Sequence, residues 1–276
     1  MCATKPMLAL DIGNTHSTLA AIRKDKILWK TTLQTAPLTE AHKAKQLAKQ
    51  IRQAITSRFE RVECIGVASV VPQAYQAFVP ILEKSLQAKL LTISASVQLP
   101  FKMGYKTPQT LGADRIAAVA FAAEHFPNQA VIIIDFGTAI TYDLLSSNAK
   151  YLGGLILASP HIVAESLWQH TAQLPKFQWR KTSALIGRST LECLQAGLFW
   201  GKVAETEGLI AKLKDKLKKK YRETNVIVMA TGGDAEQFAR TIPAIDVVEK
   251  HAVLCGIRII VEKNLSSPAH RTANKM

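Results

Sequence analysis

The sequence predicts an α/β protein made of two similar lobes, the second of which carries a helical insertion. Apolar runs rich in β-branched residues alternate with helical patterns, an order typical of sheets covered by helices. The run Asp11-Ile-Gly-Asn-Thr returns as Asp135-Phe-Gly-Thr-Ala, and a second apolar strand follows each copy. Each half also has a later strand that closes in a small-residue turn, near Ser69 and near Thr231. This repeat indicates a duplicated lobe, with a ligand-binding cleft expected between the two copies.

The elements of the first half follow from this alternation. Strands are expected at 7–12, 27–33, 63–71 and 89–94, and helices at 38–57, 72–88 and 112–125. The helix at 112–125 has the clearest signal, because it is rich in alanine and Pro127 stops it.

The second half repeats the order over a longer stretch. Strands are expected at 130–137, 139–145, 151–157, 225–233 and 244–250, and helices at 160–172, 188–219, 234–240 and 251–263. The stretch from Asp135 to Thr231 exceeds the one from Asp11 to Ser69, and the helices between residues 160 and 219 fill the difference as an insertion. We expect a first lobe at 1–125, a second at 126–265 and a flexible tail at 266–276.

Composition excludes several classes of protein. Hydrophobic residues make up 48% of the 276 residues and charged residues 20%, which suits a folded chain with a large core. No apolar run approaches the roughly 20 residues of a membrane helix, and the N-terminus does not read as a signal peptide. The four cysteines are scattered, which favours reduced thiols in a cytoplasmic protein over a zinc site or a disulfide framework: Cys2, Cys64, Cys193 and Cys255.

The chain carries a net charge of +14, from 35 basic and 21 acidic residues. This charge favours anionic partners, although a basic surface that keeps the protein in solution explains it as well. Much of it lies in the run 212–222, which is typical of the solvated end of a helix. No aromatic residues interleave this run as a platform for single-stranded nucleic acid requires, so nucleic acid is not the expected partner.

The residues of the segment 11–18 are typical of a phosphate-binding turn. Gly13 is expected to let the chain turn at positive φ and to let backbone amides approach a ligand. Asn14, Thr15, Ser17 and Thr18 add small polar groups, and Asp11 at the strand end is placed to hold a cation beside phosphates. An ordinary hairpin explains one such turn, but the second copy at Asp135 and the late run Thr-Gly-Gly-Asp at 231–234 favour a nucleotide site.

These motifs together resemble those of the actin, hexokinase and Hsp70 kinase superfamily and, more narrowly, of type III pantothenate kinases. Tyr105-x-x-Pro followed by Gly112-Ala-Asp-Arg is similar to the substrate segment of that family. The family's further motifs follow in order at 135–141, 151–154, 167–175, 186–190 and 230–234. The resemblance covers residues 7 to 260 and implies two RNase H-like, actin-like ATPase lobes.

The resemblance also implies a role for each matching residue. The ATP-binding residues would be Asp11, Ile12, Gly13, Asn14, Thr15, His16, Ser17, Thr18 and Thr138. The pantothenate-binding residues would be Tyr105, Gly112, Ala113, Asp114, Arg115 and Thr190, with Asp114 as the proton acceptor for the attacking hydroxyl. Asp11 would bind magnesium with ATP, and Asp135 would bind the monovalent cation, potassium or ammonium, that the family uses.

Taken alone, several of these residues have plainer explanations. An acidic residue in the first turn of a helix is favoured by the helix dipole, so Asp114 could be a cap instead of a base. The planar fork of Arg115 suits a carboxylate substrate but equally a surface carboxylate. Tyr105 could be a core aromatic residue, and His16 could be an exposed turn residue.

The chain departs from the family pattern in two places. Gly153-Gly-Leu-Ile-Leu-Ala158-Ser159 stands where the family has Gly-Gly-x-Ile-x-Pro-Gly, and Ser189 replaces a common Asn before Thr190. Because Pro and Gly set the backbone angles of a turn, we expect the turn at 158–159 to differ from the family's.

The function implied by the resemblance is the ATP-dependent phosphorylation of pantothenate in the cytoplasm, the first step of coenzyme A biosynthesis, by a homodimer. One alternative is another small-molecule kinase of the superfamily, which a screen of acceptor alcohols would separate. The second is a non-catalytic accessory or regulatory protein of the same fold, for which the net charge of +14 suggests a nucleic acid partner. Salt-dependent DNA binding without ATP turnover would favour this alternative.

Overall fold

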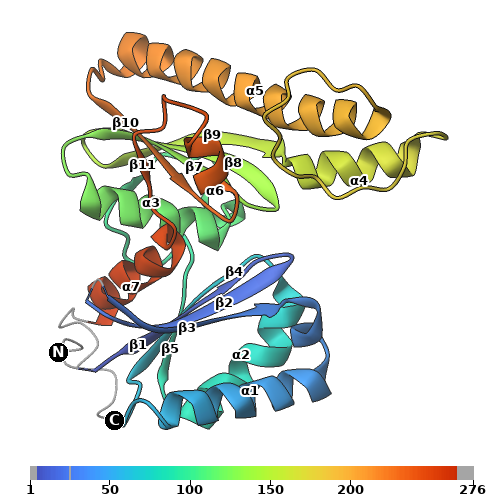
Figure 1. Cartoon of the computed structure of the whole chain (residues 1–276). Helices are drawn as coiled ribbons and strands as arrows, with labels where there is room; N and C mark the ends of the chain where they lie inside the picture. Colours follow the sequence, from blue (N-terminus) through green and yellow to red (C-terminus); the bar gives the residue numbers. More distant parts are fainter. Residues whose placement is uncertain (1–4, 25, 266–276) are drawn as a thin grey trace. The chain divides into compact units, whose positions relative to one another are not determined.

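The computed structural model of the chain describes residues 5–24 and 26–265 (Figure 1). These residues form two compact units. The first contains the residues up to His125 together with those from Ala252 onward, and the second runs from Phe126 to His251. The expected boundary at 125/126 agrees with this division, but the expected second lobe of 126–265 is wrong at its C-terminal end. The predicted tail at 266–276 lies outside the described residues.

The first unit is built on a five-stranded sheet in the order β3-β2-β1-β4-β5. Its strands are β1 (Met7–Ile12), β2 (His16–Arg23), β3 (Lys26–Gln34), β4 (Cys64–Ser69) and β5 (Lys89–Thr92). β2 runs antiparallel to β1 and β3, whereas β4 is parallel to both β1 and β5. Alternation of half-buried and exposed residues is clear only in β3, at the edge, and β1 is buried almost throughout.

Helices cover both faces of this sheet. The short helix η1 (Ala36–Thr39), α1 (Ala41–Thr56) and α2 (Pro72–Leu86) share one apolar core with β1 and β4 (Figure 1). On the other face lies α7 (Ala252–Leu265), because a Cβ at Gly66 of β4 would stand 2.5 Å from Ile257 and 2.6 Å from Val261. α3 (Ala113–His125) packs so closely on α7 that a Cβ at Gly256 would overlap the carbonyl of Ala117. This helix pair is the reason that α7 belongs to the first unit.

The second unit repeats the strand pattern of the first. Its strands run in the order β11-β10-β7-β8-β9: β7 (Ala130–Phe136), β8 (Ala139–Leu145), β9 (Lys150–Ala158), β10 (Val226–Thr231) and β11 (Val247–Val248). β8 is antiparallel to β7 and β9, and β10 is parallel to β7 and β11. The core of this unit includes Ile132, Ile134, Tyr142, Val228 and Ala230.

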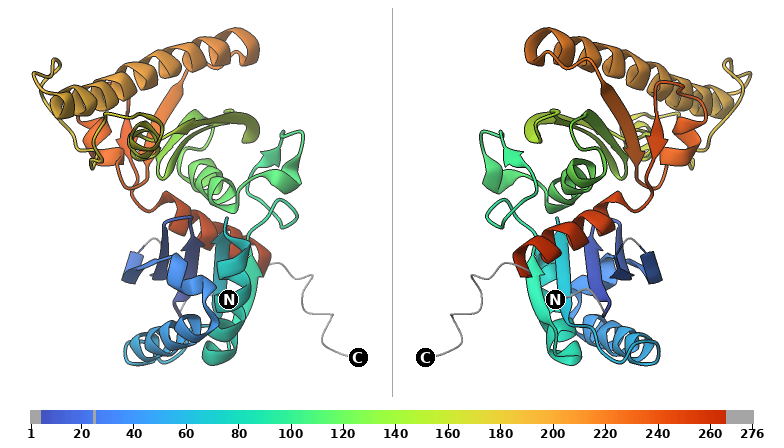
Figure 2. Two further views of the ribbon diagram at one scale, coloured as in Figure 1. Left: turned by 90° about the vertical axis from the view of Figure 1, so that its right-hand side faces the viewer. Right: turned by 90° about the vertical axis from the view of Figure 1, so that its left-hand side faces the viewer.

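The predicted insertion of the second unit is present as α4 (Pro160–His170) and the long α5 (Thr190–Tyr221) between β9 and β10. With 32 residues, α5 is the longest of the described helices, and Figure 2 shows it along its length. α4 lies beside its first half (Figure 1). α6 (Ala235–Ala239) follows β10. None of the described helices is both long and apolar enough to cross a membrane.

The predicted helices lie within a few residues of their observed bounds, and the strands differ more. The strand after the Asp11 turn was predicted at 27–33, which is β3, so β2 (His16–Arg23) was missed. The run 244–250 forms only the two-residue β11, and β6 (Lys102–Met103) and η2 (Pro108–Thr110) were not expected either. Both lie in the segment between β5 and α3, where apolar periodicity is too short to predict an element.

Candidate functional site

The turn after β1 presents the first group of candidate residues. Asp11 lies at the end of β1, half-buried, opposite Thr18 on β2 and Ala68 on β4. The turn closes with a hydrogen bond from the Gly13 amide to the His16 carbonyl at 3.1 Å. The expected positive φ at Gly13 is wrong, because Gly153 and Gly232 are the glycines with positive φ among the described residues. Glycine is needed at 13 because a Cβ there would stand 2.9 Å from the His16 carbonyl oxygen.

A residue that the sequence did not single out fixes this turn. The Thr35 hydroxyl donates to the Gly13 carbonyl at 2.7 Å, and the Thr35 amide donates to the Thr15 carbonyl at 3.0 Å. Its hydroxyl also lies 2.8 Å from that of Ser17. Thr35 is 2% exposed, so the turn is held from inside the unit while its outer face stays open. Thr35 lies 20 residues beyond Thr15 in the chain, and no local motif marks it.

The residues of the segment 11–18 differ in what they can offer a ligand. The side chains of Asn14, Thr15 and His16 are exposed, and Asp11 and Thr18 are half-buried. Ile12 and Ser17 are fully buried, so Ile12 can offer only backbone atoms. The Ser17 hydroxyl is engaged by Thr35. The turn therefore presents backbone amides, small polar groups and one carboxylate, a set that suits phosphate oxygens.

Asp114 lies in the first turn of α3, and its carboxylate is held in one position. Its Oδ1 accepts a hydrogen bond from the Arg115 amide at 2.7 Å. A Cβ at Gly112 would overlap this same oxygen, so glycine is required there to leave room for the carboxylate. Burial raises the pKa of Asp114 above its ordinary value of 3.8, although the Arg115 amide and the Arg115 charge both lower it. Asp114 is half-buried, so its carboxylate is only partly in contact with solvent.

Contacts within the first unit bring Asp114 and the turn after β1 close together. The Val70 amide donates to the Ile12 carbonyl at 3.1 Å. The Val70 Cγ1 lies 3.6 Å from the place a Cβ on Gly112 would take. Ala113 and Arg115 are buried, and Gly112 is half-buried. Tyr105, also half-buried, precedes η2 in the loop that leads to α3. The Asp11 turn and the start of α3 are thus linked through Val70.

In the second unit, Asp135 lies at the end of β7 between two strands that each place a threonine beside it. Its register partners are Thr141 on β8 and Thr231 on β10. A Cβ at Gly137 would stand 3.2 Å from its Oδ1, and a Cβ at Gly232, which has φ +94, would overlap the same oxygen. Backbone thus approaches the Asp135 carboxylate from both glycines. Thr138 follows in the turn and is exposed.

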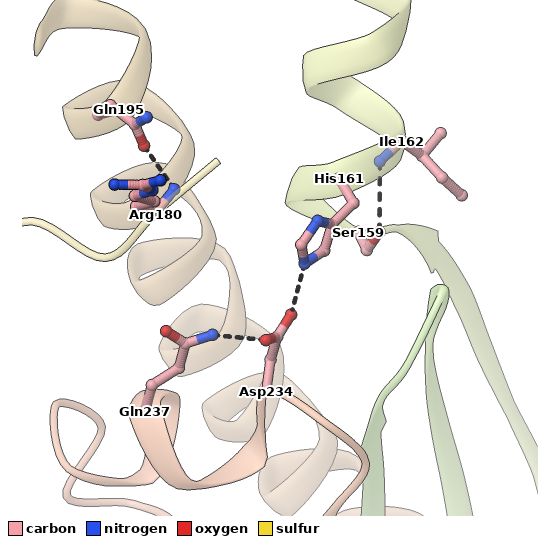
Figure 3. A network of polar contacts seen from close by, with 7 residues as sticks. All are labelled: Ser159, His161, Ile162, Arg180, Gln195, Asp234 and Gln237. Atoms are coloured by element: carbon pink, nitrogen blue, oxygen red, sulfur yellow. Dashed lines mark hydrogen bonds and ion pairs between the residues drawn. The ribbon is translucent and has the colours of Figure 1, made fainter. Parts of the chain in front are cut away.

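Asp234 ends the turn that begins at Thr231, and it joins three parts of the second unit (Figure 3). Its amide donates to the Phe136 carbonyl at 3.2 Å. Its carboxylate lies 3.1 Å from the Nε2 of His161 on α4, and it accepts a hydrogen bond from the side-chain Nε2 of Gln237 at 2.6 Å. The sequence marked the Thr-Gly-Gly-Asp turn but not this partner, because His161 stands 73 residues away from Asp234.

The two departures from the family pattern both begin helices. Ser159 is the N-cap of α4, and its hydroxyl accepts a hydrogen bond from the Ile162 amide at 3.4 Å (Figure 3). Ser189 caps α5 by accepting from the Glu192 amide at 3.3 Å, while Glu192 accepts from the Arg188 amide at 2.7 Å. The spacing Ser-x-x-Glu is that of a capping box. Thr190 is therefore the first residue of α5, and its side chain is exposed.

Buried polar contacts hold the insertion against the sheet of the second unit. The Lys202 Nζ on α5 donates to the carbonyl of Ala158, at the end of β9, at 3.0 Å, and also pairs with Glu205. The Tyr142 hydroxyl on β8 donates to Thr206 at 3.0 Å, and burial raises the pKa of Tyr142 to about 12. These contacts fix the end of β9 from which α4 starts.

The residues present fit the cations that the resemblance implies. Within 5–24 and 26–265, no three His, Cys, Asp or Glu side chains gather as a protein-only metal cage requires. Magnesium does not need such a cage when phosphates supply ligands, and one carboxylate such as Asp11 suits it. Asp135 offers a carboxylate to a monovalent cation, with two glycine backbones at close range.

Comparisons with known proteins agree with this description. The family model of type III pantothenate kinase matches residues 7–212. A type III pantothenate kinase of Chlorobaculum parvum is 36% identical over 257 residues, which cover 93% of this chain and 94% of the relative. The corresponding protein of Chlorobaculum tepidum is 33% identical over 258 residues, or 94% of each chain.

Solved structures support the fold. A Campylobacter jejuni protein assigned to the Baf family of transcriptional activators aligns with a TM-score of 0.57 and 20% identity, over 95% of this chain and 100% of that one. A Sinorhizobium meliloti protein assigned as a 2-dehydro-3-deoxygalactonokinase aligns with a TM-score of 0.59 and 12% identity, over 93% and 98%. At these identities the likeness concerns the two-lobed kinase fold alone. The motifs, the match of the family model and the relatives at 33–36% identity together show that this chain belongs to the type III pantothenate kinase family.

Proposed function

We propose that this protein transfers the γ-phosphoryl group of ATP to the primary hydroxyl of pantothenate and so forms 4′-phosphopantothenate, the first step of coenzyme A biosynthesis. Membership of the type III pantothenate kinase family supports the reaction and the substrates. The observation in this chain that carries the proposal is the half-buried Asp114 carboxylate, which is fixed at the start of α3 and lies near the Asp11 turn.

In this proposal Asp114 accepts the proton of the attacking hydroxyl. A carboxylate with a raised pKa is a stronger base than an ordinary one. The hydrogen bond from the Arg115 amide and the space left by Gly112 fix its orientation. Because phosphoryl transfer depends mostly on positioning, orienting the hydroxyl is as important as removing its proton.

The remaining candidate residues receive their proposed roles from the family pattern. Tyr105, Arg115 and Thr190 would bind pantothenate, and the open face of the turn at 13–16 would bind the phosphates of ATP with Thr138. Asp11 would hold magnesium, which neutralises phosphate charge when bound. Asp135 would hold potassium or ammonium. The buried side chains of Ile12 and Ser17 support this turn from inside.

We propose that the protein acts as a homodimer in the cytoplasm. Large apolar side chains are exposed on β9, α4, the segment before α5 and the start of α5: Ile156, Ile162, Trp168, Leu185, Ile186 and Leu191. Ile186 is 81% exposed and Leu185 is 68% exposed, and apolar surface of this kind favours association. Light scattering behind a sizing column tests this: a monomer mass at micromolar concentration would contradict the dimer.

A coupled assay that follows ADP release tests the reaction. With ATP, magnesium, potassium and pantothenate, turnover is expected, and omission of pantothenate should remove it. Mass spectrometry of the product should show the added phosphate. Turnover with another alcohol but not with pantothenate would place the chain in a different branch of the superfamily.

A further inference from the structure

A pocket of about 440 Å³ lies in the first unit, among residues that the proposed reaction does not use. It is bounded by the last turns of α1 and α2 and by the segment that joins α1 to β4. Buried Ile55 and Val62 and half-buried Phe59 give it an apolar part. Arg52, Arg61 and Lys84 line it as well, and all three are exposed. Its walls therefore combine apolar surface with positive charge.

The pocket and the Asp11 turn lie at opposite edges of the same sheet. β1, β4 and β5 are parallel, and Asp11 stands at the carboxyl end of β1. The residues that line the pocket precede β4 and β5, so they lie at the amino ends of these strands. The 15 residues of α2 run from one edge to the other, a length of roughly 22 Å at 1.5 Å per residue. A ligand in this pocket would therefore be a second ligand, distinct from the substrates.

Capping of helix α1 does not explain the basic residues of the pocket. The Arg52 carbonyl accepts from the Thr56 hydroxyl at 2.9 Å, and the Ile55 carbonyl accepts from the Phe59 amide at 2.9 Å. The Ala54 carbonyl accepts from the Arg58 guanidinium, also at 2.9 Å. The last carbonyls of α1 thus have partners without any help from Arg52, Arg61 or Lys84.

Ion pairing does not explain them either. None of Arg52, Arg61 and Lys84 forms an ion pair with a residue in the described part of the chain. Glu60 is the acidic residue of the pocket, so three positive charges face one negative charge. Like charges that converge on one pocket repel each other unless an anion joins them.

We propose that this pocket binds a small organic anion that carries a phosphate group and a flat or aliphatic apolar part. Phe59, Ile55 and Val62 would contact the apolar part. The guanidinium groups of Arg52 and Arg61 suit a phosphate, because each presents a fork of donors that can bind two oxygens. Lys84 would add a third positive charge. An uncharged analogue of the same shape would lose these contacts.

The test uses the full chain and a fluorescent probe, 8-anilinonaphthalene-1-sulfonate, with phenyl phosphate and phenol as competitors. The variant Arg52→Gln/Arg61→Gln removes two positive charges from the pocket. The control Lys45→Gln/Lys49→Gln removes two charges from exposed positions of the same helix that do not line the pocket. We expect phenyl phosphate to displace the probe and phenol to fail, and the pocket variant to bind phenyl phosphate at least about tenfold more weakly than the control.

Pantothenate kinase activity should be the same in both variants, so failure of this proposal is distinguishable from failure of the proposed function. Equal affinity for phenyl phosphate in the pocket variant and the wild type would overturn the proposal. Equal weakening in the control would overturn it too, since this result would mean attraction by net charge alone. Lys84→Gln provides a second variant at the pocket, and thermal melting confirms that each variant is folded.

Discussion

Substitution of Gly112 by alanine separates a catalytic Asp114 from one that only caps α3. A Cβ at position 112 would stand closer than 3.0 Å to the Asp114 Oδ1, whereas ordinary contact begins at 3.4 Å. The next neighbour, Val70 Cγ1, is already at an ordinary 3.6 Å. The carboxylate is therefore the group that must move, by about half an ångström or more, and its 2.7 Å bond with the Arg115 amide must change.

The size of the effect follows from this displacement. Since a misplacement of about 1 Å can cost roughly 10²-fold in rate, we expect kcat of Gly112→Ala to fall about 10- to 100-fold. The unfolding free energy should change by less than about 1 kcal/mol, because alanine favours a helix start more than glycine does. If Asp114 were only a cap, the variant would instead keep its kcat and lose roughly 0.5–2 kcal/mol of stability.

The assay is steady-state kinetics with ADP detection, combined with thermal melting. Gly197→Ala is the control, because a Cβ at Gly197 in α5 meets nothing within 4 Å. The control should keep its kcat, and its melting temperature should stay the same or rise, because alanine favours a helix interior more than glycine does. A folded Gly112→Ala protein with wild-type kcat would refute the assignment of Asp114 as a base that must be oriented.

The remaining predictions address Asp114 itself and other residues of the site. Asp114→Asn should lower kcat roughly 10²–10⁴-fold. A carboxyl pKa that is raised in the folded protein stabilises the fold below pH 3.8, and this stabilisation is lost as the pH rises through the folded pKa. Thermal melting should therefore show the Asp114→Asn variant at least as stable as the wild type at pH 7, and the wild type should regain stability toward pH 4. For the same reason the acidic limb of the kcat/KM profile, which reports the free enzyme, should have a midpoint above 3.8, and a midpoint at or below that value would contradict the upward shift of this pKa. Asp135→Asn should remove the difference in rate between potassium and sodium salts. If the variant keeps that difference, Asp135 does not bind the monovalent cation. Asp11→Ala should abolish magnesium-dependent turnover while the melting temperature stays close to that of the wild type, so near-normal turnover would disprove its role. His161→Ala should raise KM for ATP more than it lowers kcat, because the Nε2 contact at 3.1 Å positions Asp234 beside the glycine turn, and His161→Gln should restore part of the loss.

The sequence determined the order and type of most elements, because their signals are local. The helix at 113–125 was predicted within one residue, since an alanine-rich run that ends before Pro127 has few other stable conformations. The strands that carry Asp11 and Asp135 were recognised because each motif ends a long apolar run. The repeat of this motif also predicted the second unit and its insertion, which are present as β7 to β11 with α4 and α5.

The position of α7 was decided only by the tertiary structure. Its sequence is apolar on nearly all sides, which predicts burial but not the partner, and the chain order suggested the second lobe. Close approach of Gly256 to Ala117 packs α7 on α3 instead, and so assigns it to the first unit. Gly13 is similar: glycine in a turn suggested positive φ, whereas contact with the His16 carbonyl is the actual constraint.

The supporting residues of the site were also beyond sequence reasoning. Thr35, which bonds to Gly13 in the Asp11 turn, lies 22 residues from it in the sequence. His161 and Asp234 are in contact although 73 residues separate them in the sequence. Threonine and histidine are common on surfaces and in cores, so their identity alone carries no signal. The side chains that carry the proposed chemistry lie in short motifs with fixed backbone requirements and can be found in the sequence. Those that hold these motifs in place are selected by distances between distant segments, and these distances exist only in the folded chain.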